Sequence, residues 1–292
     1  MPPYPHTQVT FEAADGYPLQ GAFYLAEGSN RYLLIGSAFG VPYQYYKHFA
    51  DYMARNGFNT LVFDYRGISH SKQGNMPTDK ILMQHWGQRD IEAAIQFILA
   101  QDPVAELHYL GHSAGGQILG LAQSSPKINK IIIAASGVGT WRKWPGLQKY
   151  LLAGIWYLVF PLVKLFQKGD YFHSKMLGPI PVPKHAVNQW LNWARSKDYL
   201  FTPQHELDLS AYQAIKANIF AVTISDDWYA PVSARDALLS HYASGQTNTL
   251  LVQPKDINLK SIGHFGLFKK KQEIEQGIWQ PMLNFLTGKS DD

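Results

Sequence analysis

The chain has 292 residues, of which 46% are hydrophobic and only 16% are charged. This composition supports the core of one large domain, or of a domain with an insertion, and excludes an intrinsically disordered chain. The chain has no cysteine, which excludes disulfides and thiolate metal sites. Its first residues have neither the basic head nor the apolar run of a secretory signal, so we expect a cytoplasmic protein.

The N-terminal part of the chain predicts strands followed by a helix. Residues 7–13 and 19–26 alternate in hydrophobicity around Asp15-Gly16, a pattern typical of a β-hairpin. Two short apolar runs suited to buried strands follow, and a segment with helical spacing of its apolar residues lies between them. These are residues 31–38 and 58–67 for the strands and residues 45–57 for the helix.

From there strands and helices alternate to the end of the chain. Helices are expected at residues 83–101, after Ser113 and near the C-terminus. The expected strands are residues 106–110, 130–136, 219–225 and 248–252. Strands that alternate with helices in this way form βαβ units. The sequence therefore predicts an α/β fold with a mostly parallel central sheet and helices on both faces.

One long segment interrupts this alternation. Residues 138–210 are rich in tryptophan, proline and basic residues and contain no obvious strand. We interpret them as a helical cap or lid insertion in a core formed by residues 1–137 and 211–292. The cap is expected over the carboxyl edge of the sheet, where open α/β proteins bind their ligands.

Ser113 lies within Gly111-His112-Ser113-Ala114-Gly115, after an expected strand and before an expected helix. A nucleophile elbow places its serine on such a strand-to-helix turn. Gly111 and Gly115 suit an elbow, because larger side chains there would crowd the neighbouring strand and helix. A small-residue packing turn is the alternative interpretation of the same residues.

A serine hydroxyl becomes an effective nucleophile when a base accepts its proton and an acid orients that base. His264 follows the last expected strand in a glycine-flanked loop, and Asp226 and Asp227 follow the strand before it. Asp227 is preferred as the acid because it stands four residues before Pro231. Asp226 is then expected to cap a turn or a helix.

At these residues the chain resembles the α/β-hydrolase family over nearly its whole length. The resemblance rests on the segments "GHSAGG", "GFNTLVFDYRGISHS", "SDDWYAP" and "SIGHFG". It is strongest to a bacterial subgroup near the serine-aminopeptidase and monoacylglycerol-lipase-like branch. The resemblance implies the α/β-hydrolase fold, with Ser113 as nucleophile, His264 as base and Asp227 as orienting acid.

The loop after the third expected strand departs from the family pattern. Many relatives carry His-Gly there, whereas this chain has Ser37-Ala38. Backbone donors tolerate such a change of side chain, so an oxyanion hole is still implied. Its expected donors are the backbone N–H groups of Phe39 and Ala114, with Ala38 as the alternative to Phe39.

The expected cap concentrates positive charge. Residues 138–198 contain nine Lys or Arg and two Asp, a net charge of +7, while the rest of the chain sums to −3. Five of the eight tryptophans lie there, and residues 150–166 are the most apolar stretch. A cap helix packed on the sheet explains this stretch. The sharper alternatives are a lid that touches an anionic membrane surface and a wall of an acyl-binding pocket.

These observations predict a serine hydrolase that cleaves a carboxylic ester through an acyl-enzyme, on a hydrophobic small-molecule acyl substrate. Amide or thioester cleavage would use the same residues. No organic cofactor or metal is implied, and no nucleic-acid recognition motif accompanies the basic charge. The alternatives are a non-catalytic binding or scaffold protein on the same fold and a membrane-surface lipid hydrolase. The natural substrate and the oligomeric state are not predicted.

Overall fold

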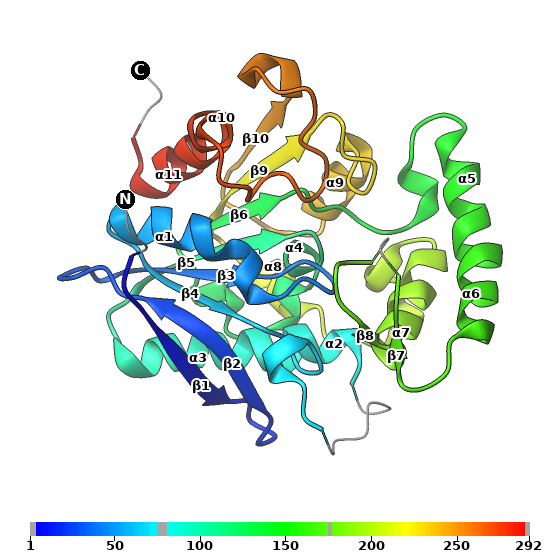
Figure 1. Cartoon of the computed structure of the whole chain (residues 1–292), viewed down its shortest axis with the longest axis horizontal. Helices are drawn as coiled ribbons and strands as arrows, with labels where there is room; N and C mark the ends of the chain where they lie inside the picture. The colour runs from blue at the N-terminus through cyan, green and yellow to red at the C-terminus, as the bar shows by residue number, and fades with distance from the viewer. Residues whose placement is uncertain (1–3, 75–80, 175–176, 290–292) are drawn as a thin grey trace.

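An eight-stranded sheet forms the centre of the computed structural model, which describes residues 4–74, 81–174 and 177–289 (Figure 1). The strand order is β1-β2-β4-β3-β5-β6-β9-β10. β2 pairs antiparallel with β1 and β4, and the remaining neighbours pair in parallel. The strands are β1 His6–Glu12, β2 Pro18–Tyr24, β3 Arg31–Gly36, β4 Asn59–Phe63, β5 Glu106–His112, β6 Lys130–Ala134, β9 Asn218–Ile224 and β10 Thr247–Val252.

Helices cover both faces of the sheet, which is why its central strands are apolar along their whole length. One face packs against α1 and the C-terminal helices. The other packs against the helices that follow β4, β5 and β9 and against the short helix just before β9. The first set is α1 Lys47–Arg55, α10 Gln272–Ile274, the π-helical turn Glu275–Trp279 and α11 Gln280–Thr287. The second set is α2 Met83–His85, the π-helical turn Trp86–Ile91, α3 Glu92–Gln101, α4 Ala114–Ile118, α8 Ser210–Ala214 and α9 Val232–Leu239. Short 3-10 turns lie at Tyr43–Tyr46, Ser69–Ser71, Leu119–Leu121, Ser125–Lys127 and Pro254–Ile257.

The predicted fold class is confirmed, and the predicted strands and helices of the core are present. The helix after Ser113 is short, since α4 ends at Ile118 and a 3-10 turn follows. Glycines in and just after this helix weaken it but allow close packing. A Cβ atom on Gly120 would lie 2.4 Å from the ring of Tyr212, so that helix α8 can approach only a glycine.

Residues 138–210, which we call the cap, lie beside the carboxyl ends of the parallel strands (Figure 1). Residues Gln148–Phe166 form one continuous helix of 19 residues at the edge of the molecule (Figure 1). We call it the cap helix. It comprises α5 Gln148–Gly154, the π-helical turn Ile155–Val159 and α6 Phe160–Phe166.

The rest of the cap fills the space between the cap helix and the sheet (Figure 1). It consists of α7 Lys184–Arg195, the antiparallel pair β7 Tyr171–Phe172 and β8 Val182–Pro183, and 3-10 turns at Trp141–Lys143, Tyr199–Phe201 and Pro203–His205. The sequence indicated no strand in this segment. β7 and β8 have two residues each, which is too short for a period-two pattern to be visible.

His108 is a titratable side chain buried in the middle of the sheet. It has no exposed surface, and its Nε2 lies 3.3 Å from Oε1 of Glu106 without forming a hydrogen bond. Burial, reinforced by the positive charges of Lys130 and Arg31, lowers the pKa of His108 to about 4. The folded protein therefore holds this imidazole neutral at pH 7.

Replacing His108 by leucine should make the free energy of unfolding less dependent on pH. Because folding lowers the pKa of His108, the unfolded chain takes up the proton first, and stability is lost as the pH falls from about 6.5 toward 4. For one such histidine the loss between pH 7 and pH 5 is about 2 kcal/mol. Urea denaturation of both proteins at the two pH values measures the difference. An equal loss in both would contradict this role of His108.

Candidate active site

Ser113 occupies a sharp turn between β5 and α4. Its backbone has φ 50° and ψ −114°, in a region that residues with a side chain rarely adopt. Two hydrogen bonds hold the turn against the end of β6. The N–H of Ser113 donates to the carbonyl of Ala134 at 3.0 Å, and the hydroxyl of Ser136 donates to the carbonyl of Ser113 at 2.7 Å.

The glycines beside Ser113 permit this turn because backbone lies directly against them. A Cβ atom on Gly111 would lie 2.5 Å from the nitrogen of Gly116 in α4. A Cβ atom on Gly115 would lie 2.2 Å from the carbonyl oxygen of Gly36 at the end of β3. Contacts that short do not occur in proteins, so both positions require glycine.

Three side chains predicted as a set form one hydrogen-bonded chain. Oγ of Ser113 lies 2.9 Å from Nε2 of His264, and Nδ1 of His264 lies 2.8 Å from Oδ2 of Asp227. An ionised Asp227 accepts from Nδ1–H, which leaves Nε2 to accept the proton of the serine hydroxyl. His264 and Asp227 are buried, whereas Ser113 is only half-buried and faces a pocket.

Asp226 and Asp227 point to different parts of the same histidine loop. Oδ2 and Oδ1 of Asp226 accept from the N–H groups of Ile262 and Gly263, each at 3.0 Å. Asp226 was expected to cap a turn or a helix, and it accepts from the two N–H groups that precede the turn beginning at His264. Its carboxylate anchors the backbone that carries His264, while Asp227 reaches the imidazole.

A second, buried series of hydrogen bonds runs behind the first, and no sequence pattern predicted it. Nε2 of His112 donates to the carbonyl of His264 at 3.1 Å, and the hydroxyl of Tyr46 donates to Nδ1 of His112 at 2.9 Å. The oxygen of Tyr46 accepts from the N–H of Ala38 at 2.8 Å. Burial lowers the pKa of His112 well below its usual value and raises that of Tyr46 well above, so both stay neutral.

The hydrogen bonds of Tyr46 distinguish the two candidate N–H donors in the loop after β3, Ala38 and Phe39. The N–H of Ala38 already bonds to Tyr46. Within the described part of the chain, the N–H groups of Phe39 and Ala114 have no hydrogen-bond partner. Ala114 is the first residue of α4, where N–H groups lack intrahelical acceptors, and both residues line the pocket beside Ser113.

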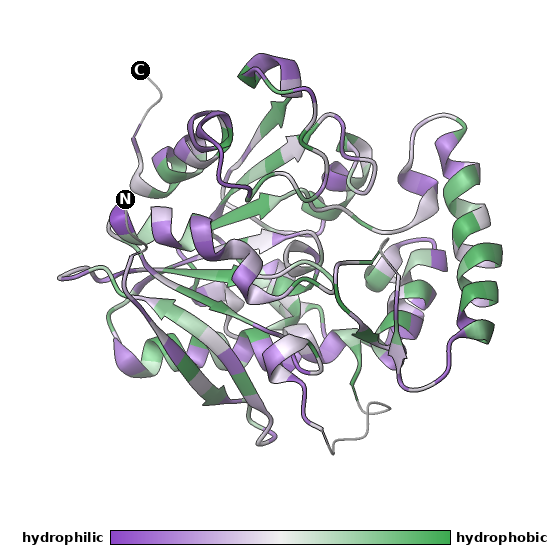
Figure 2. Ribbon diagram, viewed as in Figure 1, coloured by the Kyte–Doolittle hydropathy of each residue, from purple (hydrophilic) through white to green (hydrophobic). Residues whose placement is uncertain are grey.

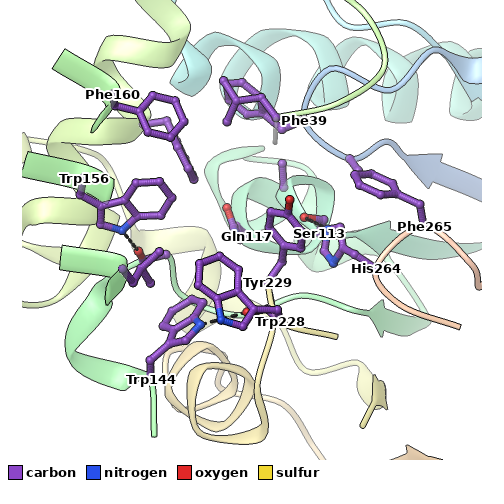
Figure 3. Close-up of a pocket in the computed structure, with 16 residues that line it drawn as sticks. Phe39, Ser113, Gln117, Trp144, Trp156, Phe160, Trp228, Tyr229, His264 and Phe265 are labelled. Carbon is purple, nitrogen blue, oxygen red and sulfur yellow. Dashed lines mark hydrogen bonds between the residues drawn. The ribbon is translucent and has the colours of Figure 1, made fainter. Parts of the chain in front are cut away.

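The pocket in front of Ser113 is lined mainly by aromatic side chains from both parts of the molecule (Figure 3). The cap contributes Trp144, Trp156, Phe160 and Trp190, and the loops of the core contribute Phe39, Trp228, Tyr229 and Phe265. Gln117 is a polar group in the wall, and it is fixed by bonds to the carbonyl of Gly137 and the hydroxyl of Tyr199. None of the sixteen described lining residues is Asp, Glu, Lys or Arg.

The tryptophans of the cap point inward. Trp144, Trp156 and Trp190 line the pocket, Trp193 is buried, and Trp141 is partly buried against the same core. Three of the five therefore form part of the pocket wall, and the other two pack in the core beside it.

Phe39 links the cap to the core. The centroid of its ring lies 5.0 Å from that of Trp86 on the core side and 5.6 Å from that of Trp190 in α7.

As for metal binding, the described residues contain no cluster of three or more His, Cys, Asp or Glu side chains.

Residues 32–222 match the family described as serine aminopeptidase, S33. This segment is well over half of the chain and runs from β3 into β9. The chain belongs to the serine aminopeptidase (S33) family of α/β hydrolases. In this S33 member Ser113 lies within the matched segment, whereas Asp227 and His264 follow it.

Solved structures place the S33 member among α/β hydrolases over its whole length. A soluble variant of monoglyceride lipase from Saccharomyces cerevisiae, in complex with a substrate analogue, has a TM-score of 0.66 at 15% identity and covers 100% of both chains. An esterase from Pyrococcus furiosus has a TM-score of 0.61 at 14% identity, over 98% of this chain and 91% of the other. Est1E from Butyrivibrio proteoclasticus, with ferulic acid bound, has a TM-score of 0.61 at 13% identity, over 96% of this chain and 98% of the other. A comparison with curated proteins gives no match.

Replacing Asp226 by alanine should loosen the histidine loop while leaving the sheet intact. The N–H groups of Ile262 and Gly263 lose their acceptor, so their hydrogen exchange should become at least about 10-fold faster, equivalent to losing one charge-assisted bond. Hydrogen exchange followed by mass spectrometry measures the peptide that contains them. Asp256→Ala, which removes an exposed carboxylate on a neighbouring turn, is the control. Unchanged exchange in the Asp226 variant would contradict the anchoring role.

Proposed function

We propose that the protein is a serine hydrolase that cleaves carboxylic esters through an acyl-enzyme on Ser113. The observation that carries this proposal is the hydrogen-bonded chain from Ser113 through His264 to Asp227, with the serine facing an apolar pocket. Membership of the S33 family supports a hydrolytic activity.

In the proposed mechanism His264 acts first as a base and then as an acid. Oγ of Ser113 attacks the ester carbonyl as Nε2 of His264 accepts its proton. The resulting imidazolium donates that proton to the departing alkoxide, and the alcohol leaves the acyl group on Ser113. Water then attacks the acyl-enzyme by the same route, which releases the carboxylic acid and restores the serine. Asp227 holds the imidazole in the required tautomer throughout.

The N–H groups of Phe39 and Ala114 are the proposed oxyanion donors. Both lack a partner among the described residues and line the pocket beside Ser113. Donors of this kind meet the charge that develops on the carbonyl oxygen, and each contributes about 3–4 kcal/mol to the stability of the transition state. Phe39 is preferred over Ala38 because the N–H of Ala38 is engaged by Tyr46.

The lining of the pocket favours a neutral, apolar acyl ester over a peptide with a free N-terminus. An aminopeptidase substrate carries an ammonium group next to the scissile bond, and burying an unpaired charge among aromatic rings is costly. The sixteen described lining residues offer no carboxylate to pair with it. We therefore expect esters to be the substrates, with the acyl chain against the aromatic wall.

The first experiment asks whether Ser113 is an activated nucleophile. The native protein should form a single covalent adduct with a fluorophosphonate, and Ser113→Ala should form none, as read by intact mass. Ser240→Ala, which removes an exposed hydroxyl, is the matched control and should label as the native protein does. No adduct on the folded native chain would refute the proposed activity and favour a non-catalytic binding protein.

The second experiment compares substrates of matched leaving groups. For p-nitrophenyl esters, kcat/KM should rise by about 4-fold for each added methylene until the pocket is full, because each buried CH₂ contributes about 0.8 kcal/mol. Aminoacyl p-nitroanilides should be cleaved far more slowly, since their ammonium group has no partner in the pocket. Faster cleavage of the anilides would contradict the assignment as an esterase.

A further inference from the structure

The cap helix exposes an unusual amount of apolar surface. Of the fourteen large hydrophobic side chains that are exposed in the described residues, ten lie between residues 147 and 166. They are Leu147, Tyr150, Leu151, Tyr157, Leu158, Val159, Leu162, Val163, Leu165 and Phe166. We call this set, which includes Leu147 just before the helix, the outer face of the cap helix. Figure 2 shows α5 and α6, at the edge of the molecule, as mostly hydrophobic along their length.

The opposite face of the same helix lines the pocket. Leu152, Trp156 and Phe160, spaced four residues apart, are buried and line the cavity in front of Ser113. A surface helix of a globular protein places polar residues on the side away from the core. The cap helix instead has Leu165 and Phe166 about four-fifths exposed, at 78% and 85%. This outer face lacks the polar residues that water favours.

Positive charge flanks the outer face at both ends. Residues 141–168 contain five basic and no acidic residues. Arg142, Lys143 and Lys149 lie at the N-terminal end, and Lys164 and Lys168 lie at the C-terminal end. Lysine and arginine can extend along an apolar surface while their charges reach a polar boundary. Apolar side chains bordered by cations match an interface between acyl chains and anionic headgroups.

We propose that the outer face of the cap helix docks on an anionic lipid surface. The exposed leucine, valine and phenylalanine side chains enter the boundary between headgroups and acyl chains. The flanking lysines contact lipid phosphates. Because Leu152, Trp156 and Phe160 belong to the same helix, the pocket then lies one helix diameter, about 10 Å, from the lipid. The idea that esters dissolved in the membrane reach Ser113 rests on the function proposed above. The docking of the cap helix on lipid does not depend on that function.

The helix lies on the surface rather than spanning the membrane, although its length and composition would allow it to cross. Both of its ends are tied to the rest of the protein. Before the helix, Nε1 of Trp144 donates to the carbonyl of Trp228 at 2.9 Å. After it, Nζ of Lys184 donates to the carbonyl of Gln167 at 2.5 Å. Crossing the bilayer would break these bonds and expose the inner face to lipid.

A second copy of the chain fits the outer face less well than an anionic surface does. A twofold dimer brings the same patch of each copy together. An antiparallel pairing of two cap helices centred on the middle of the helix sets Lys149 of one copy toward Lys164 of the other. No acidic residue in 141–168 offsets this repulsion.

Vesicle cosedimentation in the absence of any ester substrate tests the proposal. At low salt the native protein should bind vesicles of equal phosphatidylcholine and phosphatidylglycerol, and bind phosphatidylcholine vesicles much more weakly. Each cation near an anionic surface strengthens binding about 5-fold, so Lys149→Gln/Lys164→Gln/Lys168→Gln should weaken it about 100-fold. The matched control is Lys255→Gln/Lys260→Gln/Lys271→Gln, which removes three exposed charges outside the cap.

A second pair of variants tests the apolar part of the surface. Leu158→Gln/Leu162→Gln/Leu165→Gln should lose at least about 10-fold in vesicle binding. The control Leu25→Gln/Val104→Gln/Leu251→Gln alters three exposed apolar side chains elsewhere and should bind as the native protein does. None of these six residues lines the pocket, so labelling of Ser113 by fluorophosphonate should remain unchanged and report correct folding.

Two outcomes would overturn the proposal. One is that the native protein fails to bind anionic vesicles at low salt. The other is that light scattering finds a dimer which the leucine variant converts to a monomer, with no vesicle binding by either. The outer face would then be a contact between copies. Because binding is measured without substrate, absence of ester hydrolysis would leave the vesicle result standing.

Discussion

The close approach of α4 to the end of β3 is the constraint on which the site depends. Gly115 lies so near the carbonyl of Gly36 that no side chain fits between them. This contact seats the first turn of α4 against the sheet, and the chain reaches it only through the strained conformation of Ser113. The strain holds the hydroxyl clear of the strand and within reach of His264, which comes from a loop more than a hundred residues later. A residue larger than glycine would disturb the site without touching any group that reacts.

The loops around Ser113 are held by two layers of hydrogen bonds. In the outer layer, Asp227 fixes the imidazole of His264 and Asp226 fixes its backbone. In the inner layer, neutral His112 and Tyr46 connect the carbonyl of His264 to the loop after β3. Because the inner layer is buried and uncharged, it resists competition from water and changes of pH across the neutral range. The position of the imidazole relative to the backbone donors is thus set from behind the site.

Much of this arrangement could be predicted from the sequence because its signals are local. Continuous runs of Val, Ile and Leu predict buried parallel strands, and the glycines around Ser113 predict the turn. The link from His112 to Tyr46 could not be predicted, since it joins residues 66 apart and a buried histidine has no pattern of its own. The orientation of the cap helix could not be predicted from the sequence either. With apolar residues on both faces, its sequence shows no periodicity that separates the pocket side from the outer side.

The position of Phe39 between two tryptophans makes the cap and the core thermodynamically dependent on one another. Trp86 supports the ring from the core, and Trp190 supports it from α7 of the cap. Any displacement of α7 removes one of the two supports of the residue that carries a candidate oxyanion donor. By reciprocity, a ligand that stabilises the observed position of Phe39 also stabilises the observed packing of α7 against it, by the same coupling free energy. Ligand binding at the pocket and the packing of α7 on Phe39 are therefore thermodynamically coupled.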